Sequence, residues 1–171
     1  MKLEPTAMVE AVWNIPPQRL WQQGIRALIL DLDNTLVDWN QEYLRPEVEA
    51  WAQACRRAGI SLCLCTNARR SSRVGRIASK IGASYLLRAG KPFAKAWRRA
   101  LWLLRSRPEE AAVIGDQVFT DIWGANRMGL FTILVRPLSK RDFFATRLPR
   151  RLERRLLRRW QARGKAFEKS L

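Results

Sequence analysis

Short apolar runs alternate along this chain with segments in which apolar residues recur at helical spacing. Residues 27–30 form a continuous aliphatic run, and they predict a strand over residues 27–32 that is buried on both faces of a parallel sheet. Similar short runs predict four more strands, at residues 61–65, 85–87, 112–114 and 131–135. Helical periodicity, with glycines as stop signals, predicts helices at residues 46–58, 71–82, from Pro92 to Leu104, and 121–128. On the inner face of the helix from Pro92 we expect Phe93, Ala96, Trp97, Ala100, Leu101 and Leu104.

This alternation predicts an α/β fold, a doubly wound, Rossmann-like parallel sheet of five strands with helices between them. At 171 residues the chain fits one domain with an ordinary core. We divide it into an N-terminal extension that packs on the core (residues 1–24), a central domain (25–139) and a basic C-terminal tail (140–171). No apolar stretch approaches the roughly 20 residues that a membrane span needs.

Two carboxylates, Asp31 and Asp33, stand at the carboxyl end of the first predicted strand, where open α/β sheets bind their ligands. Ionisation of both of these close carboxylates in a site sheltered from water has a high free-energy cost unless a cation neutralises them. Mg²⁺ suits this role because it prefers oxygen ligands and reaches proteins through carboxylates and substrate phosphate. The alternative is a pair of aspartates that only caps a helix or closes a turn.

Three later strand ends carry polar residues as well. Thr66 and Asn67 can hold a phosphoryl oxygen, Lys91 can balance phosphate charge, and Asp116 is followed five residues later by Asp121. Each has a structural alternative, as a turn, a solvated loop lysine or a residue of a helix's first turn. Four polar strand ends in succession favour a site over these alternatives, because parallel strands place their carboxyl ends at one edge of the sheet.

The composition removes several kinds of chemistry. The chain has no histidine, which excludes Ser-His-Asp and Cys-His nucleophile systems and histidine-bound zinc. Its three cysteines are too few for a disulfide scaffold, and with no signal peptide a reducing cytosol is expected. Cys63 and Arg69 have the spacing of cysteine-dependent phosphatases, but Cys63 lies inside an apolar run, and no glycine follows to wrap a phosphate. We therefore reject that alternative.

The four polar strand ends resemble the motifs of the haloacid dehalogenase-like (HAD) superfamily of aspartate-nucleophile phosphatases. Residues 31–35 match the first motif, Thr66 the second, Lys91 the third, and residues 115–121 the fourth. Residues 31–39, 90–92 and 115–129 further resemble the YqeG group of subclass IIIA, which is related to phosphatidylglycerophosphate phosphatases. The similarity covers residues 3 to 160 or so. Ala68 departs from it, since many relatives are expected to have a second asparagine there.

The resemblance implies a mechanism with named roles. Asp31 would attack phosphorus and form an aspartyl-phosphate, which splits one difficult hydrolysis into two easier steps. Asp33 would protonate the leaving oxygen and then help to deprotonate water. Thr66, Asn67 and Lys91 would stabilise the transferring phosphoryl group.

The resemblance also implies that Mg²⁺ is the cofactor. Its expected ligands are the Asp31 carboxylate, the Asp33 backbone carbonyl, Asp116 and, through water, Asp121. HAD enzymes that act on small metabolites usually carry an inserted cap domain. Here 34 residues separate Asp31 from Thr66 and 24 separate Thr66 from Lys91, so a capless enzyme is expected. An open site suits a phosphate presented on something large.

The C-terminal tail carries much of the formal net charge of +17. In a helix over residues 148–160, one half of the helical wheel holds Leu148, Leu152, Leu156, Leu157 and Trp160, with Glu153 and Arg159 on the same side. The other half holds Arg147, Arg150, Arg151, Arg154, Arg155 and Arg158. Such a helix is typical of a membrane-surface element for anionic lipid, with Trp160 at the interface. Two alternatives stay open, a helix packed on the core with a solvated basic face, and RNA binding.

These observations predict a Mg²⁺-dependent phosphomonoester hydrolase. The resemblance implies phosphatidylglycerophosphate as the expected substrate, converted to phosphatidylglycerol at a membrane surface. We expect a cytoplasmic protein attached peripherally to the inner face of a membrane, with an anionic phospholipid as substrate. The alternative is an RNA- or ribosome-associated interaction protein whose phosphatase activity on a macromolecular substrate is secondary.

Overall fold

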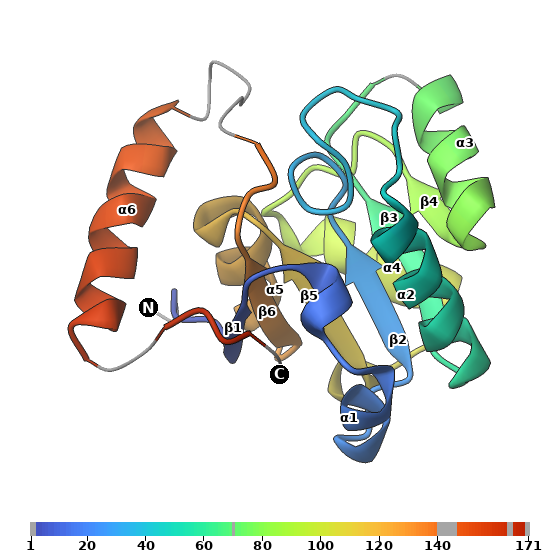
Figure 1. Ribbon diagram of the computed structural model, residues 1–171, viewed down its shortest axis with the longest axis horizontal. Helices are drawn as coiled ribbons and strands as arrows, with labels where there is room; N and C mark the ends of the chain where they lie inside the picture. The colour runs from blue at the N-terminus through green and yellow to red at the C-terminus, as the bar shows by residue number, and fades with distance from the viewer. Residues whose placement is uncertain (1–2, 70, 140–146, 164–165, 170–171) are drawn as a thin grey trace.

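A computed structural model describes residues 3–69, 71–139, 147–163 and 166–169. A six-stranded sheet, parallel throughout, runs through its centre in the order β1-β6-β5-β2-β3-β4 (Figure 1). The strands are β1 (Ala7–Val9), β2 (Ala27–Leu30), β3 (Ser61–Cys65), β4 (Ser84–Leu86), β5 (Ala111–Gly115) and β6 (Phe131–Val135). The doubly wound parallel fold predicted from the sequence is confirmed.

The sixth strand, β1, was not among the five that we predicted. It comes from the N-terminal segment, which was expected only to pack on the core, and it pairs with β6 at the edge of the sheet. Thr6 just before it bonds Thr132 of β6, with its backbone N–H donating to the Thr132 hydroxyl at 3.1 Å. A strand of three residues is too short to show a period of two in the sequence, so only its pairing reveals it.

Helices cover both faces of the sheet because the strand side chains alternate between them (Figure 1). Leu28 and Leu30 pack on one face, whereas Ala27 and Ile29 pack on the other. The first face is covered by η1 (Val12–Asn14), α1 (Pro17–Gln22), α2 (Pro46–Arg57) and α3 (Ser71–Ile81). The second face is covered by α4 (Ala94–Leu104) and α5 (Trp123–Asn126). Two short elements, η2 (Pro108–Glu110) and η3 (Val118–Ile122), flank β5.

Two of the predicted helices differ in detail. The helix expected from Pro92 begins at Ala94, because Phe93 keeps an extended backbone and its N–H donates to Gly90 O at 3.0 Å. Phe93 is consequently 74% exposed rather than part of the inner face. The helix expected over residues 121–128 is divided into the π-helical turn η3 and the short helix α5.

The C-terminal tail forms α6 (Arg147–Gln161) and packs on the protein. Trp160 is buried in an apolar cluster, the edge cluster, with Leu156 and Leu157 packed against it. The buried members of the edge cluster are Met8, Val118, Ile122, Leu134 and Trp160. The Trp160 side chain is therefore not available to insert into a bilayer. On this side of α6 the alternative interpretation, a helix packed on the core, is the correct one.

The basic side of α6 is exposed at Arg154, Arg155 and Arg158, and Arg159 is exposed as well. Leu152, expected among the apolar positions, is 47% exposed. The side chains of Arg147, Leu148, Arg150 and Arg151 lie outside the described residues. In the part of the chain that the structure describes, no helix is long and apolar enough to cross a membrane.

Beyond α6 the chain returns to the sheet edge. Glu168 N–H donates to Met8 O at 2.9 Å, and Glu10 N–H donates to Glu168 O at 3.1 Å. The Arg136 guanidinium lies over the Phe167 ring, 4.4 Å from its centroid. These contacts cover the edge that β1 would otherwise leave unpaired.

Candidate active site

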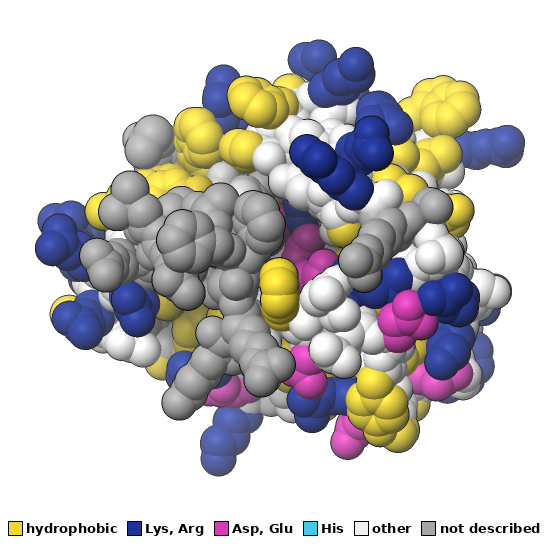
Figure 2. All heavy atoms as spheres, turned by 90° about the horizontal axis from the view of Figure 1, so that it is seen from above, with side chains coloured by type: hydrophobic (Ala, Val, Ile, Leu, Met, Phe, Trp, Pro, Cys, Tyr) yellow, Lys and Arg dark blue, Asp and Glu magenta, His cyan; other side chains and the backbone are white. Residues whose placement is uncertain are grey.

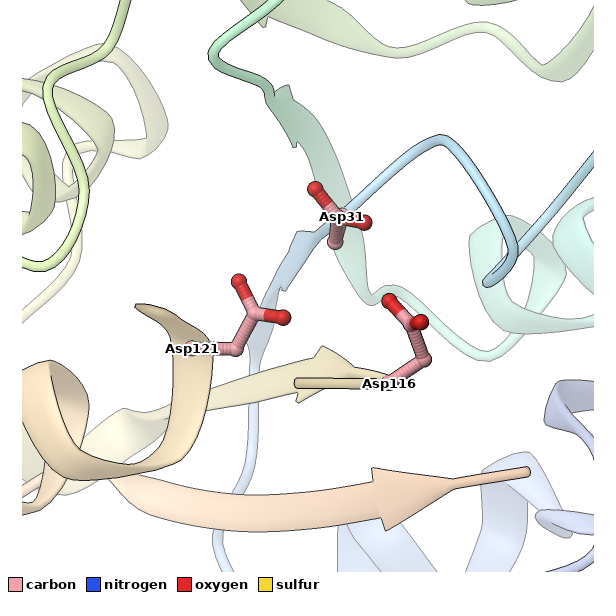
Figure 3. A group of neighbouring side chains, drawn as sticks. All are labelled: Asp31, Asp116 and Asp121. Carbon is pink, nitrogen blue, oxygen red and sulfur yellow. The ribbon is translucent and has the colours of Figure 1, made fainter. Parts of the chain in front are cut away.

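The first two site carboxylates follow two adjacent strands. β2 and β5 pair with Leu30 opposite Ile114, and Asp31 and Asp116 come directly after them. The chain leaves β2 toward β3 and leaves β5 toward β6, so this pair is the switch point at which open α/β sheets bind ligands. In Figure 3 the two side chains lie near each other at these strand ends.

Asp121 joins them from η3. Its Oδ2 accepts the N–H of Gln117 at 3.2 Å, which folds the carboxylate back over the start of its own turn. The close approach requires a glycine at position 115, because a Cβ there would lie 2.4 Å from the Asp121 carboxyl carbon. The turn after β5 thereby brings Asp121 toward Asp31 and Asp116 (Figure 3).

These three carboxylates have the donor set of a cation site. One oxygen from each of Asp31, Asp116 and Asp121 lies within 4.8 Å of the others. The Lys91 ammonium donates to Asp31 and also to Asp121 Oδ1 at 2.7 Å. Three carboxylates and one ammonium leave a formal charge of −2, which a divalent cation with oxygen ligands would neutralise. The residues present therefore fit Mg²⁺.

The electrostatics of the site follow from burial. Desolvation raises the pKa of the Asp31 carboxyl above its ordinary value, and Lys91 only partly offsets this. Burial alone would lower the pKa of the Lys91 ammonium, but Asp121 and Asp31 outweigh it, so this pKa lies above its ordinary value. Lys91 is therefore a permanent cation at neutral pH and cannot serve as a general base.

Thr35 connects the two strand ends. Its hydroxyl is placed to donate to Asp116 Oδ1 at 3.3 Å and to Asp31 Oδ2 at 3.4 Å. Asn34 beside it takes a positive φ of 66°, which an asparagine tolerates, and its Oδ1 accepts the Ser139 hydroxyl at 2.7 Å. The loop after β2 is thus held against the segment that follows β6.

The second motif lies where predicted, but Asn67 has a different set of contacts from the one expected. Its Oδ1 accepts the N–H of Gly90 at 2.9 Å and that of Lys91 at 3.0 Å, while its Nδ2 donates to Lys91 O at 3.2 Å. Asn67 therefore supports the backbone that carries Lys91. Thr66 is buried, and its hydroxyl accepts the N–H of Ala68 at 3.1 Å.

Asp33 has a partner that the sequence reading missed. The buried Arg73 of α3 donates from Nη2 to both Asp33 oxygens, at 2.8 and 2.7 Å. Asn40 N–H also donates to Asp33 Oδ1 at 2.7 Å, and Arg73 Nη1 donates to Gln41 O at 2.7 Å. Arg73 lies 40 residues from Asp33 within an arginine-rich chain, so no local pattern distinguishes it.

The environment of the cysteines supports the rejection of a cysteine-dependent mechanism. Burial raises the pKa of Cys63 to about 12 and that of Cys65 likewise to about 12. Both thiols thus stay protonated at neutral pH, and a protonated thiol is not the nucleophilic form.

Comparison with known proteins identifies the family to which the chain is similar. Residues 38–129 match the family described as haloacid dehalogenase-like hydrolase. The chain is 35% identical over 160 residues to the "Probable phosphatase YqeG" of Bacillus subtilis, which covers 94% of this chain and 92% of that protein. It is 27% identical over 169 residues to phosphatidylglycerophosphate phosphatase 1, chloroplastic/mitochondrial, of Arabidopsis thaliana. That match covers 94% of this chain and 49% of the plant protein.

Solved structures show the same fold. An uncharacterized protein from Listeria monocytogenes aligns with a TM-score of 0.55 at 17% identity, over 75% of this chain and 97% of that chain. The 3-deoxy-D-manno-octulosonate 8-phosphate phosphatase from Yersinia pestis aligns with a TM-score of 0.53 at 21% identity, over 70% and 66%. The fold, the site and the sequence matches agree: this chain belongs to the haloacid dehalogenase-like hydrolases and is a phosphatase, a phosphoric monoester hydrolase.

Proposed function

We propose that this phosphatase works through an aspartyl-phosphate on Asp31 and depends on Mg²⁺. The observation that carries the proposal is the approach of Asp31, Asp116 and Asp121 oxygens to within 4.8 Å of one another, with the Lys91 ammonium paired to Asp31 and Asp121. Asp116 and the two other carboxylates would hold Mg²⁺, together with the Asp33 backbone carbonyl. When bound, the ion would neutralise charge on Asp31 and on the phosphate that approaches it.

In the proposed first step the Asp31 carboxylate attacks phosphorus, and the ester oxygen leaves on the opposite side. Lys91 stabilises charge on the phosphoryl oxygens, with Thr66 as a further donor and Asn67 supporting the Lys91 backbone. Asp33 supplies the proton to the leaving oxygen. Because Arg73 donates to both Asp33 oxygens, the carboxyl must give up one of these contacts when it takes up a proton, while the other contact keeps it oriented.

As substrate we propose phosphatidylglycerophosphate, whose product is phosphatidylglycerol. One support is the similarity to the phosphatidylglycerophosphate phosphatase of Arabidopsis. A second support is the absence of a cap domain in residues 31–91, of which only residue 70 lies outside the described part. The segment from Asp31 to Thr66 and the segment from Thr66 to Lys91 each contain one helix. A third is the surface at the carboxyl edge, where acidic side chains lie recessed near the centre with basic ones around them (Figure 2). Exposed cations on this edge include Arg69, Arg88 and Lys95.

Peripheral attachment to an anionic membrane is part of this proposal. The exposed arginines of α6 would contribute by charge alone, since Trp160 is buried in the edge cluster. The same exposed cations would also attract RNA, which supports the second candidate, an RNA- or ribosome-associated protein with a secondary phosphatase activity. In both cases residues 25–139 form the catalytic domain, because every proposed site residue lies within them.

Phosphate release with and without Mg²⁺ tests the proposal. The substrates are phosphatidylglycerophosphate in vesicles, a soluble phosphate ester and a phosphorylated RNA end. We expect Mg²⁺-dependent release that is fastest on the lipid, reversible loss with EDTA, and no release by a folded Asp31→Asn variant. Activity in Asp31→Asn would contradict the mechanism, whereas preference for the RNA would favour the second candidate.

A further inference from the structure

Glu153 occupies an unexpected place in α6. It is the one acidic residue among residues 147–161, yet its exposed fraction is only 3%. It lies on the same face of the helix as Leu156, Leu157 and Trp160, at positions three, four and seven residues before them. A carboxylate on such a face is costly to bury unless a donor compensates it.

One such donor belongs to the turn that carries Asp121. Glu153 Oε1 accepts the backbone N–H of Phe119 at 3.2 Å, across 34 residues of sequence. Phe119 is the second residue of η3, and the first N–H groups of a helical turn have no partner within it. Gln117, which precedes the turn, offers no side-chain cap. Glu153 therefore does from a distant helix what a serine or aspartate usually does at an N-cap.

The packing of α6 on η3 reinforces this contact. Val118 and Ile122, the first and last residues of η3, are both buried in the edge cluster with Trp160. Asp121 lies between them and points the other way, with Oδ2 toward Gln117 N–H and Oδ1 toward Lys91. A shift of this turn would therefore move the Asp121 carboxylate relative to Asp31.

We propose that Glu153 is a positioning residue, which holds η3 so that Asp121 faces Asp31 and Asp116. The C-terminal helix is then part of the support of the active site. This inference rests on the proposed metal centre, because its consequence is a weaker cation site when Glu153 is lost. Mutation of groups that orient metal ligands without touching the ion commonly lowers metal affinity by roughly 10- to 100-fold.

Calorimetric titration of the full chain with Mg²⁺ alone tests the proposal, with Glu153→Ala and Glu153→Gln as variants. We expect about tenfold weaker binding in Glu153→Ala. Glu153→Gln should recover part of the affinity, because its amide oxygen still accepts the Phe119 N–H. Arg154→Ala is the matched control, since it removes a charged side chain from the exposed face of the same helix and should bind like the wild type.

Amide hydrogen exchange of residues 117–122 without Mg²⁺ separates this inference from the metal centre. Glu153→Ala should accelerate exchange in that turn, and Arg154→Ala should not. Equal Mg²⁺ affinity in the wild type and a folded Glu153→Ala would overturn the positioning role. If the wild type itself binds no Mg²⁺, the proposed metal centre fails, and unchanged exchange in Glu153→Ala would overturn the positioning role as well.

Discussion

The Asp121 carboxylate fills the space that a side chain on Gly115 would need: a Cβ on Gly115 would lie 2.4 Å from both the carboxyl carbon and Oδ2 of Asp121. Gly115 ends β5, and Asp121 belongs to the turn that follows. The backbone at Gly115 has no positive φ, so an alanine could adopt it without backbone strain. The glycine is therefore required for the approach of Asp121 and not for the path of the chain.

Gly115→Ala should consequently lower phosphatase activity strongly while the protein still folds. The added methyl group must push the Asp121 carboxylate away from Lys91 and Asp31, and a displacement of about 1 Å at a reacting centre can cost on the order of 10²-fold in rate. Steady-state kinetics and circular dichroism measure the two effects. Gly75→Ala is the control, because its Cβ would meet Tyr85 at an ordinary 3.6 Å. Wild-type activity in a folded Gly115→Ala would contradict this account of the turn.

Arg73→Gln should affect catalysis according to the leaving group. Without the buried guanidinium the Asp33 carboxylate loses its two-oxygen contact and its orientation. Hydrolysis of an alkyl phosphate, whose leaving oxygen needs a proton, should fall about 10²-fold, and that of p-nitrophenyl phosphate much less. Breaking the ion pair should also lower the free energy of unfolding by about 3 kcal/mol.

Arg76→Gln is the matched control for Arg73→Gln. Arg76 lies on the same helix and pairs with Glu42, but both side chains of this pair are about half exposed. Exposed ion pairs contribute little to stability, so urea unfolding and both hydrolysis rates should match the wild type. An equal fall in both rates for Arg73→Gln would indicate that Arg73 does not act through proton transfer.

The cysteines should play no part in catalysis. Burial raises the pKa of Cys55, Cys63 and Cys65 to about 12 from an ordinary value near 9. Iodoacetamide at pH 8 should therefore leave phosphate release unchanged over the time in which it alkylates a free thiol. Rapid inactivation with labelling of Cys63, identified by mass spectrometry, would revive the cysteine alternative.

The same three thiols predict how stability changes with pH. Above about pH 9 the unfolded chain loses thiol protons that the folded protein keeps, so the unfolded state binds fewer protons. These thiols thus contribute stability that is fully present below pH 9 and lost as the pH rises toward 12. Urea unfolding at pH 7.5 and pH 10 measures the difference. For each cysteine changed to alanine, the fall in unfolding free energy between these two pH values should become smaller.

Reversal of Arg154, Arg155 and Arg158 to glutamate should weaken binding to anionic vesicles. Each basic residue near such a surface contributes about 1 kcal/mol. All three side chains are exposed, so the fold and the hydrolysis of a soluble phosphate ester should be unchanged. Sedimentation with phosphatidylglycerol vesicles measures binding. If the triple variant pellets like the wild type at physiological salt, α6 is not the membrane contact.

The sequence by itself determined five of the six strands and the edge of the sheet at which the site lies. Largely apolar runs such as Ser61–Cys65 and Phe131–Val135 became strands with the predicted bounds, because a strand buried on both faces needs mostly apolar side chains. Since all these strands run parallel, polar residues that follow them meet at one edge. The order of the motifs alone therefore placed Asp31, Lys91, Asp116 and Asp121 in one region.

Only the tertiary structure decided which groups hold this site in place. The pairing of Arg73 with Asp33 and the hydrogen bond from Phe119 to Glu153 join residues 40 and 34 positions apart. Asn67 likewise contacts the backbone at Gly90 and Lys91. Periodicity and local propensity report the secondary structure of a segment and the face that it buries. Which donor a buried carboxylate or amide finds depends on how distant segments pack, and no short pattern in the chain contains that information.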